Sequence, residues 1–291
     1  MLHTRRWTPL LYLAPMVLLL LFVFAFPIVR IFEFSTKRIR GFDGPFIGLD
    51  NYTSTFRDPV FVESVVHSAL LLVAVPILLA SSIFVAAVLH DRAPGWRIYR
   101  VVIFIPFILA IPIVATVFKQ LLQLNGALNV TLRSAGLDAL ALDWLGDPSV
   151  ALWTIMAIIV WREVGFGIIL FSARMTSLSE EIGEAAKIDG AGWWSRLWYV
   201  TIPQLKPVIE FYTIISVITV LSAVFAYVWV ITKGGPGTAT QIVELYLFNY
   251  AFRNNLLGVA SAVAVLLFIL TVILIVPLFR IRAQAQVEEL A

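Results

Sequence analysis

Long apolar runs separated by shorter polar intervals extend along almost the whole chain. Six runs are long enough, at about 20–25 residues, to cross roughly 30 Å of hydrocarbon as helices that rise 1.5 Å per residue. We predict membrane spans at residues 10–32, 65–89, 101–122, 150–170, 208–231 and 256–279. The pattern therefore predicts an all-α integral membrane protein with six transmembrane helices and both termini on one side.

Three prolines, Pro76, Pro106 and Pro112, lie inside the second and third predicted spans. Neighbouring groups can satisfy the carbonyls that such prolines free in membrane helices. At each proline we therefore predict a static kink in the span in preference to a hinge.

Basic residues indicate which side holds the termini. They flank the spans directly on the N-terminal side, at Arg5, Arg6, Arg92, Arg97, Arg100, Arg280 and Arg282. The loop after the first span is also basic, so the bias is weak, and we predict cytoplasmic termini from the flanking positions. No small-residue cleavage site follows the first run, which predicts an uncleaved anchor rather than a signal peptide.

The polar interval at residues 171–207, between the fourth and fifth runs, has a pattern of its own. Ser177 and Glu180 have the spacing of a capping box, which predicts the start of a short helix. Asp189 and Gly190 predict its end, because glycine tolerates the left-handed conformation that terminates helices. A second helix is predicted from apolar residues that recur at helical spacing, with prolines before the next run: Trp193, Trp194, Leu197, Trp198, Val200, Pro203 and Pro207.

Within this interval, residues 184–203 resemble the EAA loop of the membrane subunits of ABC importers. The family pattern is Glu-Ala-Ala, three residues, Gly, nine residues and Ile-x-Leu-Pro. The chain matches this spacing at Glu184-Ala185-Ala186, Gly190 and Val200-Thr201-Ile202-Pro203. Val200 and Ile202 replace the favoured Ile and Leu and conserve their bulk and apolarity. The combined motif, in an interval between two spans, is far more specific than a bare Glu-Ala-Ala.

The resemblance extends to both sides of this loop. Residues 47–61 resemble the segment that leads into the second span of carbohydrate-type ABC permeases. The Gly234-Gly235-Pro236 turn and residues 258–262, Gly-Val-Ala-Ser-Ala, look like one of the two membrane partners of sugar importers. The resemblance implies the type I ABC importer permease fold. It also implies an N-terminal helix and external loop at residues 1–64, a core permease domain at 65–282 with the 171–207 loop, and a cytoplasmic tail at 283–291.

Membership of this family would imply a complex in the inner membrane of a prokaryote. Its other parts would be a second homologous permease subunit, a dimer of cytoplasmic ATP-binding subunits and an external solute-binding protein or lipoprotein. ATP and Mg would be bound by the ATPase, so no cofactor is expected in this chain. The resemblance implies ATPase coupling through a carboxylate, two small residues, a helix end and the proline before the fifth span: Glu184, Ala185, Ala186, Asp189, Gly190 and Pro203.

A second group of residues is a candidate for the path of the solute. Arg162 and Glu163 lie in the fourth run, where a charge costs roughly 2.5–3.5 kcal/mol on insertion scales, so both should face protein or water. A contact with the pathway or gate and an ion pair between subunits both explain them. Sugar sites combine aromatic faces with polar groups, which Tyr227, Trp229, Asn249 and Tyr250 could supply, although membrane-interface aromatics or helix packing explain these four better.

Composition supports a membrane protein and restricts its chemistry. The chain is 60% hydrophobic and 13% charged, against roughly 45–50% apolar residues in soluble domains. It has no cysteine, three scattered histidines and a net charge of +3, which basic span flanks explain better than nucleic-acid binding.

The chain has no phosphate-binding G-x-x-x-x-G-K-[ST] loop, no H-E-x-x-H and no G-x-S-x-G with partner residues. We therefore predict that it is not an enzyme and that ATP hydrolysis takes place in a separate partner subunit. A sugar-class solute is predicted from the resemblance, with glycerol phosphate or another small polar solute as the alternative. An ion-coupled carrier and a membrane scaffold or enzyme remain the rivals from other classes.

Overall fold

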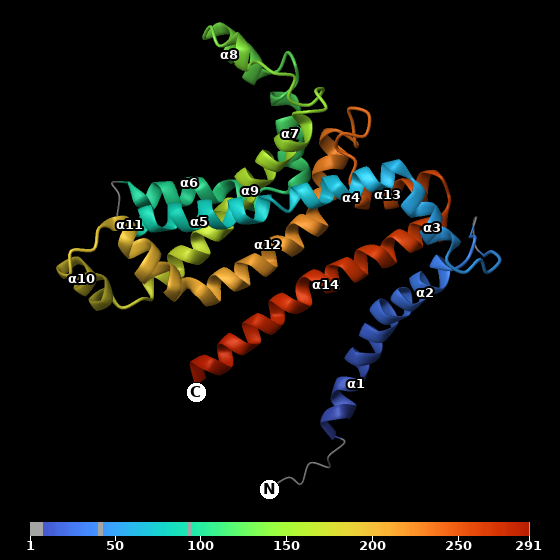
Figure 1. The fold of residues 1–291 in the computed structure, drawn as a ribbon, viewed down its shortest axis with the longest axis horizontal. Helices are drawn as coiled ribbons and strands as arrows, with labels where there is room; N and C mark the ends of the chain where they lie inside the picture. The colour runs from blue at the N-terminus through green and yellow to red at the C-terminus, as the bar shows by residue number, and fades with distance from the viewer. Residues whose placement is uncertain (1–7, 40–42, 92–94, 291) are drawn as a thin grey trace. The chain divides into compact units, whose positions relative to one another are not determined.

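The computed structural model describes residues 8–39, 43–91 and 95–290 of the 291-residue chain. Arg5, Arg6 and Arg92, three of the basic residues used for the orientation, lie outside the described residues. Within the described residues the chain is almost entirely helical, and the only β-type pairing is an isolated bridge between Lys37 and Phe46. The all-α prediction is confirmed (Figure 1).

The α-helices of the described chain are α1 Thr8–Leu20, α2 Phe26–Ser35, α3 Asp50–Arg57, α4 Pro59–Leu71, α5 Ala74–His90, α6 Trp96–Ile108, α7 Ile111–Leu121, α8 Ala127–Ser134, α9 Ala151–Thr176, α10 Glu180–Ile188, α11 Trp193–Arg196, α12 Ile202–Ile231, α13 Val243–Phe248 and α14 Leu257–Leu290. Three π-helical turns, η1 Leu21–Ala25, η3 Leu197–Thr201 and η4 Asn249–Arg253, and one 3-10 turn, η2 Asp138–Leu140, complete them.

Within residues 8–39, 43–91 and 95–290, five helical stretches are long and apolar enough to cross a membrane, and a sixth span results if a bent helix pair counts as one. The five are Tyr12–Ser35, Pro59–His90, Ala151–Thr176, Trp193–Ile231 and Leu257–Pro277. None of the first span's apolar window is buried, against 56% for Ala151–Thr176.

The third predicted span is not one continuous helix, so the prediction of a kinked but unbroken span is wrong. The segments Ile98–Ile108 and Ile111–Leu121 meet at 99°. Leu109 and Ala110 are both extended at the corner, with ψ of 139° and 137°. Pro112 then lies in the first turn of α7, where no intrahelical N–H is needed, so it favours a new helix start rather than a kink.

The chain divides into two compact units. Met1–Val62 and Tyr246–Leu270 form unit 1, and Glu63–Leu245 and Thr271–Ala291 form unit 2. The division into residues 1–64, 65–282 and 283–291 that the sequence suggests stays a prediction.

Unit 1 is organised around a buried amide and a close backbone approach. The Asn51 side chain donates to the carbonyl oxygens of Ser35 and Lys37 at 2.8 and 2.9 Å. A Cβ atom on Gly258 would lie 2.2 Å from the Lys37 carbonyl oxygen, so this position near the start of α14 accepts only glycine. The loop between α2 and α3 is thereby packed onto the last long helix.

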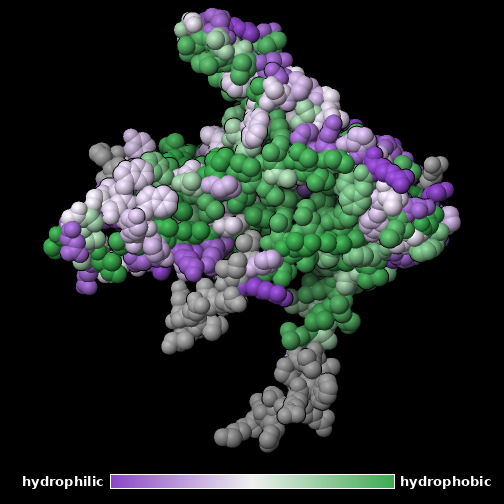
Figure 2. Space-filling model, in the orientation of Figure 1, coloured by the Kyte–Doolittle hydropathy of each residue, from purple (hydrophilic) through white to green (hydrophobic). Residues whose placement is uncertain are grey.

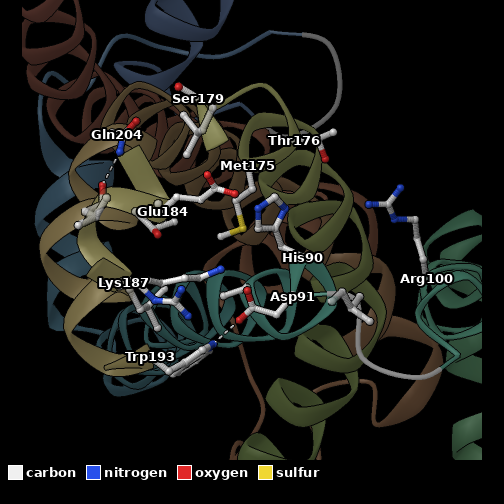
Figure 3. Close-up of a pocket in the computed structure, with 18 residues that line it drawn as sticks. His90, Asp91, Arg100, Met175, Thr176, Ser179, Glu184, Lys187, Trp193 and Gln204 are labelled. Atoms are coloured by element: carbon white, nitrogen blue, oxygen red, sulfur yellow. Dashed lines mark hydrogen bonds between the residues drawn. The ribbon is translucent and has the colours of Figure 1, made fainter. Parts of the chain in front are cut away.

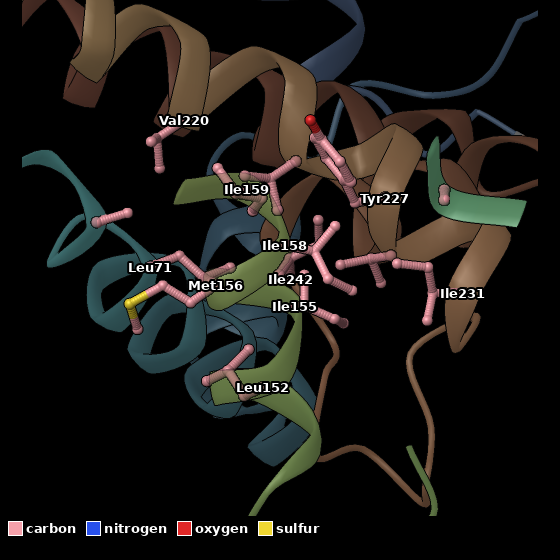
Figure 4. Packing of buried hydrophobic residues seen from close by; sticks show 14 of the residues in the cluster. Leu71, Leu152, Ile155, Met156, Ile158, Ile159, Val220, Tyr227, Ile231 and Ile242 are labelled. Atoms are coloured by element: carbon pink, nitrogen blue, oxygen red, sulfur yellow. The ribbon is translucent and has the colours of Figure 1, made fainter. Parts of the chain in front are cut away.

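Unit 2 is built around α9, which packs against α5, α6 and α12. Its main hydrophobic cluster joins Leu71 of α4, Ile155 and Ile159 of α9, and Val220 and Ile231 of α12 (Figure 4). Figure 2 shows hydrophobic residues over the middle of the helices and hydrophilic residues gathered nearer their ends and loops. Burial of α9 on several sides therefore makes it the scaffold on which the neighbouring helices are positioned.

Candidate coupling loop and membrane-embedded charge site

The short helix of the patterned loop is present as α10, which ends at Ile188 with Asp189 as its C-cap and Gly190 directly after it. Gly190 has φ of +79°, the left-handed conformation. The Gly190 N–H donates to the Lys187 carbonyl at 3.1 Å, and the Ala191 N–H donates to the Ala186 carbonyl at 2.9 Å. These two bonds define a Schellman motif, which satisfies carbonyls that the helix end leaves unpaired. The predicted helix stop at Asp189 and Gly190 is confirmed.

The predicted start of this helix is wrong. Ser177 does not cap α10. It ends α9, and its hydroxyl donates back to the Arg174 carbonyl oxygen at 2.7 Å. The N-cap of α10 is Ser179, without a side-chain capping bond. The cause is that α9 continues to Thr176, beyond the predicted end of the fourth span, so only residues 177–179 are left as the link between the two helices.

The second predicted helix and the fifth span form one continuous helical stretch from Trp193 to Ile231. Its 39 residues correspond to about 58 Å at 1.5 Å per residue, nearly twice the hydrocarbon thickness. The predicted boundary at Pro203 and Pro207 is therefore wrong. The π-helical turn η3 ends at Thr201, two residues before Pro203, and such wider turns are one way in which helices accommodate an inserted irregularity.

A cleft of about 730 Å³ separates α10 from the ends of the neighbouring helices. Glu184 and Lys187 of α10 extend into it, as does His90 from the end of α5 (Figure 3). Arg100 and Arg196 also line it, so charges of both signs face the same space. The structure places the Glu184 side chain in this cleft within the chain, and its contact with an ATPase stays a prediction.

The rest of α10 is apolar rather than charged, and its apolar side chains have little to pack against. Ile188, the last residue of the helix, is 86% exposed, and Ile182 is 48% exposed. Ala185 is also exposed, and a Cβ atom on Gly183 would meet nothing within 4 Å. A short helix with small and apolar exposed residues in a polar loop is suited to docking against a second protein.

Arg162 and Glu163 are brought together with Tyr227, as a buried group in unit 2. An Arg162 nitrogen donates to Glu163 Oε1, and Glu163 is only 7% exposed. The Tyr227 hydroxyl donates to the same oxygen at 3.4 Å. Arg162 also donates to the backbone carbonyl oxygens of Phe107 and Leu109, at the break in the third span. The ion pair is made within the chain, and any contact of these residues with solute stays a prediction.

The other three candidates for the solute path do not join this group. Trp229 stacks on Phe225 at a ring-centroid distance of 5.9 Å and packs against the main hydrophobic cluster. Asn249 and Tyr250 belong to unit 1. Tyr250 stacks on Tyr246 at 4.3 Å.

Both tyrosine hydroxyls, of Tyr246 and Tyr250, donate to Asp58 Oδ2, at 2.7 and 2.8 Å. Burial opposes ionisation of Asp58, but these bonds and those from backbone N–H groups outweigh it and lower the pKa of the carboxyl group. Asp58 also accepts a bond from the Val60 N–H at the start of α4. The geometry supports a structural role for Asp58, whose hydrogen bonds join the start of α4 to α13 and η4.

Residues 79–284 of the chain match the model of the family described as the binding-protein-dependent transport system inner membrane component. The chain belongs to this family. It is therefore a multi-pass inner membrane component of a transporter that depends on a binding protein. The match includes the whole loop with α10 and the Arg162–Glu163 pair.

Individual proteins similar to this chain match it over most of its length. It is 34% identical to the lactose transport system permease protein LacF of Rhizobium radiobacter, over 84% of the chain and 83% of LacF. It is 35% identical to the diacetylchitobiose uptake system permease protein NgcF of Streptomyces coelicolor, over 80% of the chain and 70% of NgcF. Its fold matches a subunit of a bacterial ABC transporter involved in the import of alginate, with a TM-score of 0.83, 19% identity and 96% coverage of each chain.

Two connections in this permease have no signal in the sequence. One is the bond from Trp193 Nε1 to Asp91 Oδ2, which joins residues 102 positions apart. The other is the bonding of Arg162 to backbone carbonyls 53 and 55 positions away. Helical periodicity places a residue on a face, but it cannot identify a partner on another helix.

Proposed function

We propose that the chain is a transmembrane subunit of an ATP-driven importer for a carbohydrate-class solute. The observation on which this depends is the loop geometry: an exposed short helix, a glycine end and a single long helix that continues into the membrane. The names of the relatives, which specify lactose and diacetylchitobiose, support a carbohydrate. Glycerol phosphate or another small polar solute is the alternative, which uptake competition would detect.

The partners that we propose are those that the family resemblance implies, and the exposed surface of α10 supports one of them. Two copies of a cytoplasmic ATPase would bind ATP and Mg, and one of them would receive α10 through Ala185, Ala186 and the exposed Ile188. A second related permease subunit would complete the translocation path, and an external binding protein would deliver solute. Nucleotide-driven movement of the ATPase would shift α10, and the helix from Trp193 to Ile231 would transmit that shift into the membrane.

The absence of cysteine from the sequence gives a direct test of this arrangement. Single variants Ile188→Cys and Leu137→Cys place a thiol on exposed residues of α10 and of the loop between the third and fourth spans. With cytoplasmic termini, an impermeant maleimide should label Leu137→Cys in intact cells and Ile188→Cys only after permeabilisation. The reverse pattern would overturn the proposed orientation.

Reconstitution tests the function itself. The chain would be co-expressed with the ATPase and the second permease of its gene cluster, purified and placed in liposomes with the binding protein. We expect uptake of labelled oligosaccharide that requires ATP, and a crosslink from Ile188→Cys to the ATPase. Uptake that persists without the ATPase would instead favour an ion-coupled carrier.

A further inference from the structure

The corner in the third span leaves backbone groups that need partners. The last carbonyls of α6 have no N–H four residues ahead, because Leu109 and Ala110 are extended. An unpaired carbonyl in a water-free environment costs several kcal/mol. The break is therefore tolerated only where another part of the protein supplies donors.

Arg162 supplies those donors from α9. Its Nε and Nη2 atoms donate to the Leu109 carbonyl oxygen at 3.1 and 2.9 Å, and Nη2 donates to the Phe107 carbonyl oxygen at 3.1 Å. The guanidinium carbon also lies 5.5 Å from the centre of the Phe107 ring. A planar fork can bond two carbonyls at once, and a cation is favoured at the negative C-terminal end of a helix.

A second contact binds α6 to α9 one turn away. A Cβ atom on Gly165 would lie 2.5 Å from the Ile103 carbonyl oxygen, so the two helices touch here through backbone. Glu163 neutralises Arg162 and is itself reached by Tyr227 of α12. Arg162 and Gly165 thus fasten the end and the middle of α6 to α9.

The other half of the broken span has a different neighbour. α7 packs chiefly against α12 and also contacts α9 through the rings of Phe118 and Trp161, whose centroids are 5.0 Å apart, whereas α6 packs chiefly against α9. α12 is continuous with the helix that begins at Trp193, next to the coupling loop. Movement of α12 relative to α9 would therefore act more on α7 than on α6, and the extended residues Leu109 and Ala110 lie where the two halves join.

We propose that Arg162 is a positioning residue of the transport cycle: it holds the end of α6 on α9, so that the corner at Leu109 and Ala110 absorbs the movement of α7. This inference rests on the proposed function. It assigns the Arg162–Glu163 pair neither to solute binding nor to contact with another subunit. The bonds to the carbonyls matter, and Glu163 serves to neutralise the charge.

The test compares three changes in the reconstituted complex, with Glu163→Gln as the matched control. Arg162→Met removes the donors, and we expect at least a tenfold fall in maximal uptake rate with an unchanged half-saturating concentration of loaded binding protein. Glu163→Gln leaves the carbonyl bonds intact, so its rate should fall less than threefold. The double variant Arg162→Met/Glu163→Gln should remain as slow as Arg162→Met.

Spin labels at Ile105→Cys on α6 and Val117→Cys on α7 report the corner directly, because both positions are exposed and the chain has no other cysteine. Arg162→Met should broaden the distance distribution about twofold, and Glu163→Gln should not. Should Arg162→Met fail to fold, Arg162→Lys takes its place, because one ammonium group cannot reproduce the fork.

Three results would overturn the proposal. Recovery of transport in the double variant would show that only the paired charge matters. A raised half-saturating concentration with a normal maximal rate would assign Arg162 to solute or binding-protein recognition. Native behaviour of Arg162→Lys in both measurements would remove the need for the fork. Failure of the native complex to take up solute with ATP would instead refute the proposed function.

Discussion

Trp193 Nε1 donates to Asp91 Oδ2 at 2.5 Å and so joins the first residue of α11 to the residue that follows α5. The Trp193 ring also meets Phe84 of α5 edge to face, with a centroid separation of 6.1 Å. The link lies at one side of the cleft that faces α10. It ties the start of the long helix to α5 next to the loop that carries α10.

Replacement of Asp91 tests this link. Asp91→Ala removes the acceptor, and a lost hydrogen bond of about 1 kcal/mol corresponds to roughly fivefold faster local opening. We expect that increase in amide hydrogen exchange at residues 193–196. Asp91→Asn retains a side-chain oxygen and should exchange like the native protein. Equal exchange in all three proteins would show that the bond does not hold the helix start.

Substitutions at Gly190 distinguish the effect of backbone strain from the effect of side-chain size. A Cβ atom there would meet nothing within 4 Å, so Gly190→Ala should suffer only the left-handed backbone penalty of about 1–2 kcal/mol. Gly190→Asn should suffer less, because asparagine visits that conformation more readily. Gly190→Trp adds bulk on the proposed docking side and should uncouple ATP hydrolysis from uptake.

The matched control for these variants is Gly183→Ala, which also enters open space but has no positive φ. Uptake and ATP hydrolysis would be measured together in liposomes. Normal coupling in Gly190→Trp would contradict a docking role for this helix end, even where Gly190→Ala loses stability.

The parts of the structure that the sequence predicts are those encoded locally. The apolar runs predict the membrane helices because hydrocarbon demands continuous apolar surface. Gly190 predicts a helix end because few other residues adopt its conformation. The Gly234–Gly237 turn is likewise non-helical, with positive φ at Gly234 and Gly237.

The parts that it does not predict depend on long-range contacts. The residues around Leu109 are as apolar as their neighbours, so hydropathy continues through the corner. The corner is stabilised by Arg162, and backbone carbonyls have no signature in the sequence. The sequence predicts Ser177 at the start of α10, but it lies at the end of α9, because serine suits the end of one helix and the start of the next equally well. The roles of Glu184 and Pro203 in coupling stay predictions.

At Gly165, the close approach of α6 to α9 leaves no room for a side chain. Gly165→Ala puts a methyl group 2.5 Å from the Ile103 carbonyl oxygen, which is backbone and cannot rotate away. We expect overpacking to cost about 1–3 kcal/mol. Thermal unfolding in detergent should show a lower midpoint for this variant than for Gly183→Ala. An unchanged midpoint would mean that the helices separate at little cost.

Glu244 predicts a pH dependence of stability. Burial raises the pKa of this carboxyl group on α13 from 4.5 to about 7, so folding favours its protonated form. The folded protein therefore binds more protons than the unfolded chain between these values, and stability falls as the pH rises from about 4.5 through 7. Glu244→Gln stays neutral and should unfold at a higher temperature than the native protein at pH 8. At pH 4.5 the two midpoints should coincide, and a difference that is independent of pH would contradict the assignment.

The hydrogen bonds of the Asn129 side chain indicate that the loop between the third and fourth spans folds as a small module of its own. Its side chain is fully buried, donates to the carbonyl oxygens of Leu124 and Leu142 at 3.1 and 2.8 Å, and accepts from Trp144 Nε1 at 2.9 Å. Asn129→Ala leaves these groups unpaired, at a cost of about 1–3 kcal/mol for each that stays buried. Limited proteolysis should then cut within residues 123–149 while the membrane helices remain intact. Val130→Ala, at a neighbouring position that is 55% exposed, should be cut no faster than the native protein. Cleavage at the same rate in Asn129→Ala would show that the amide does not organise the module.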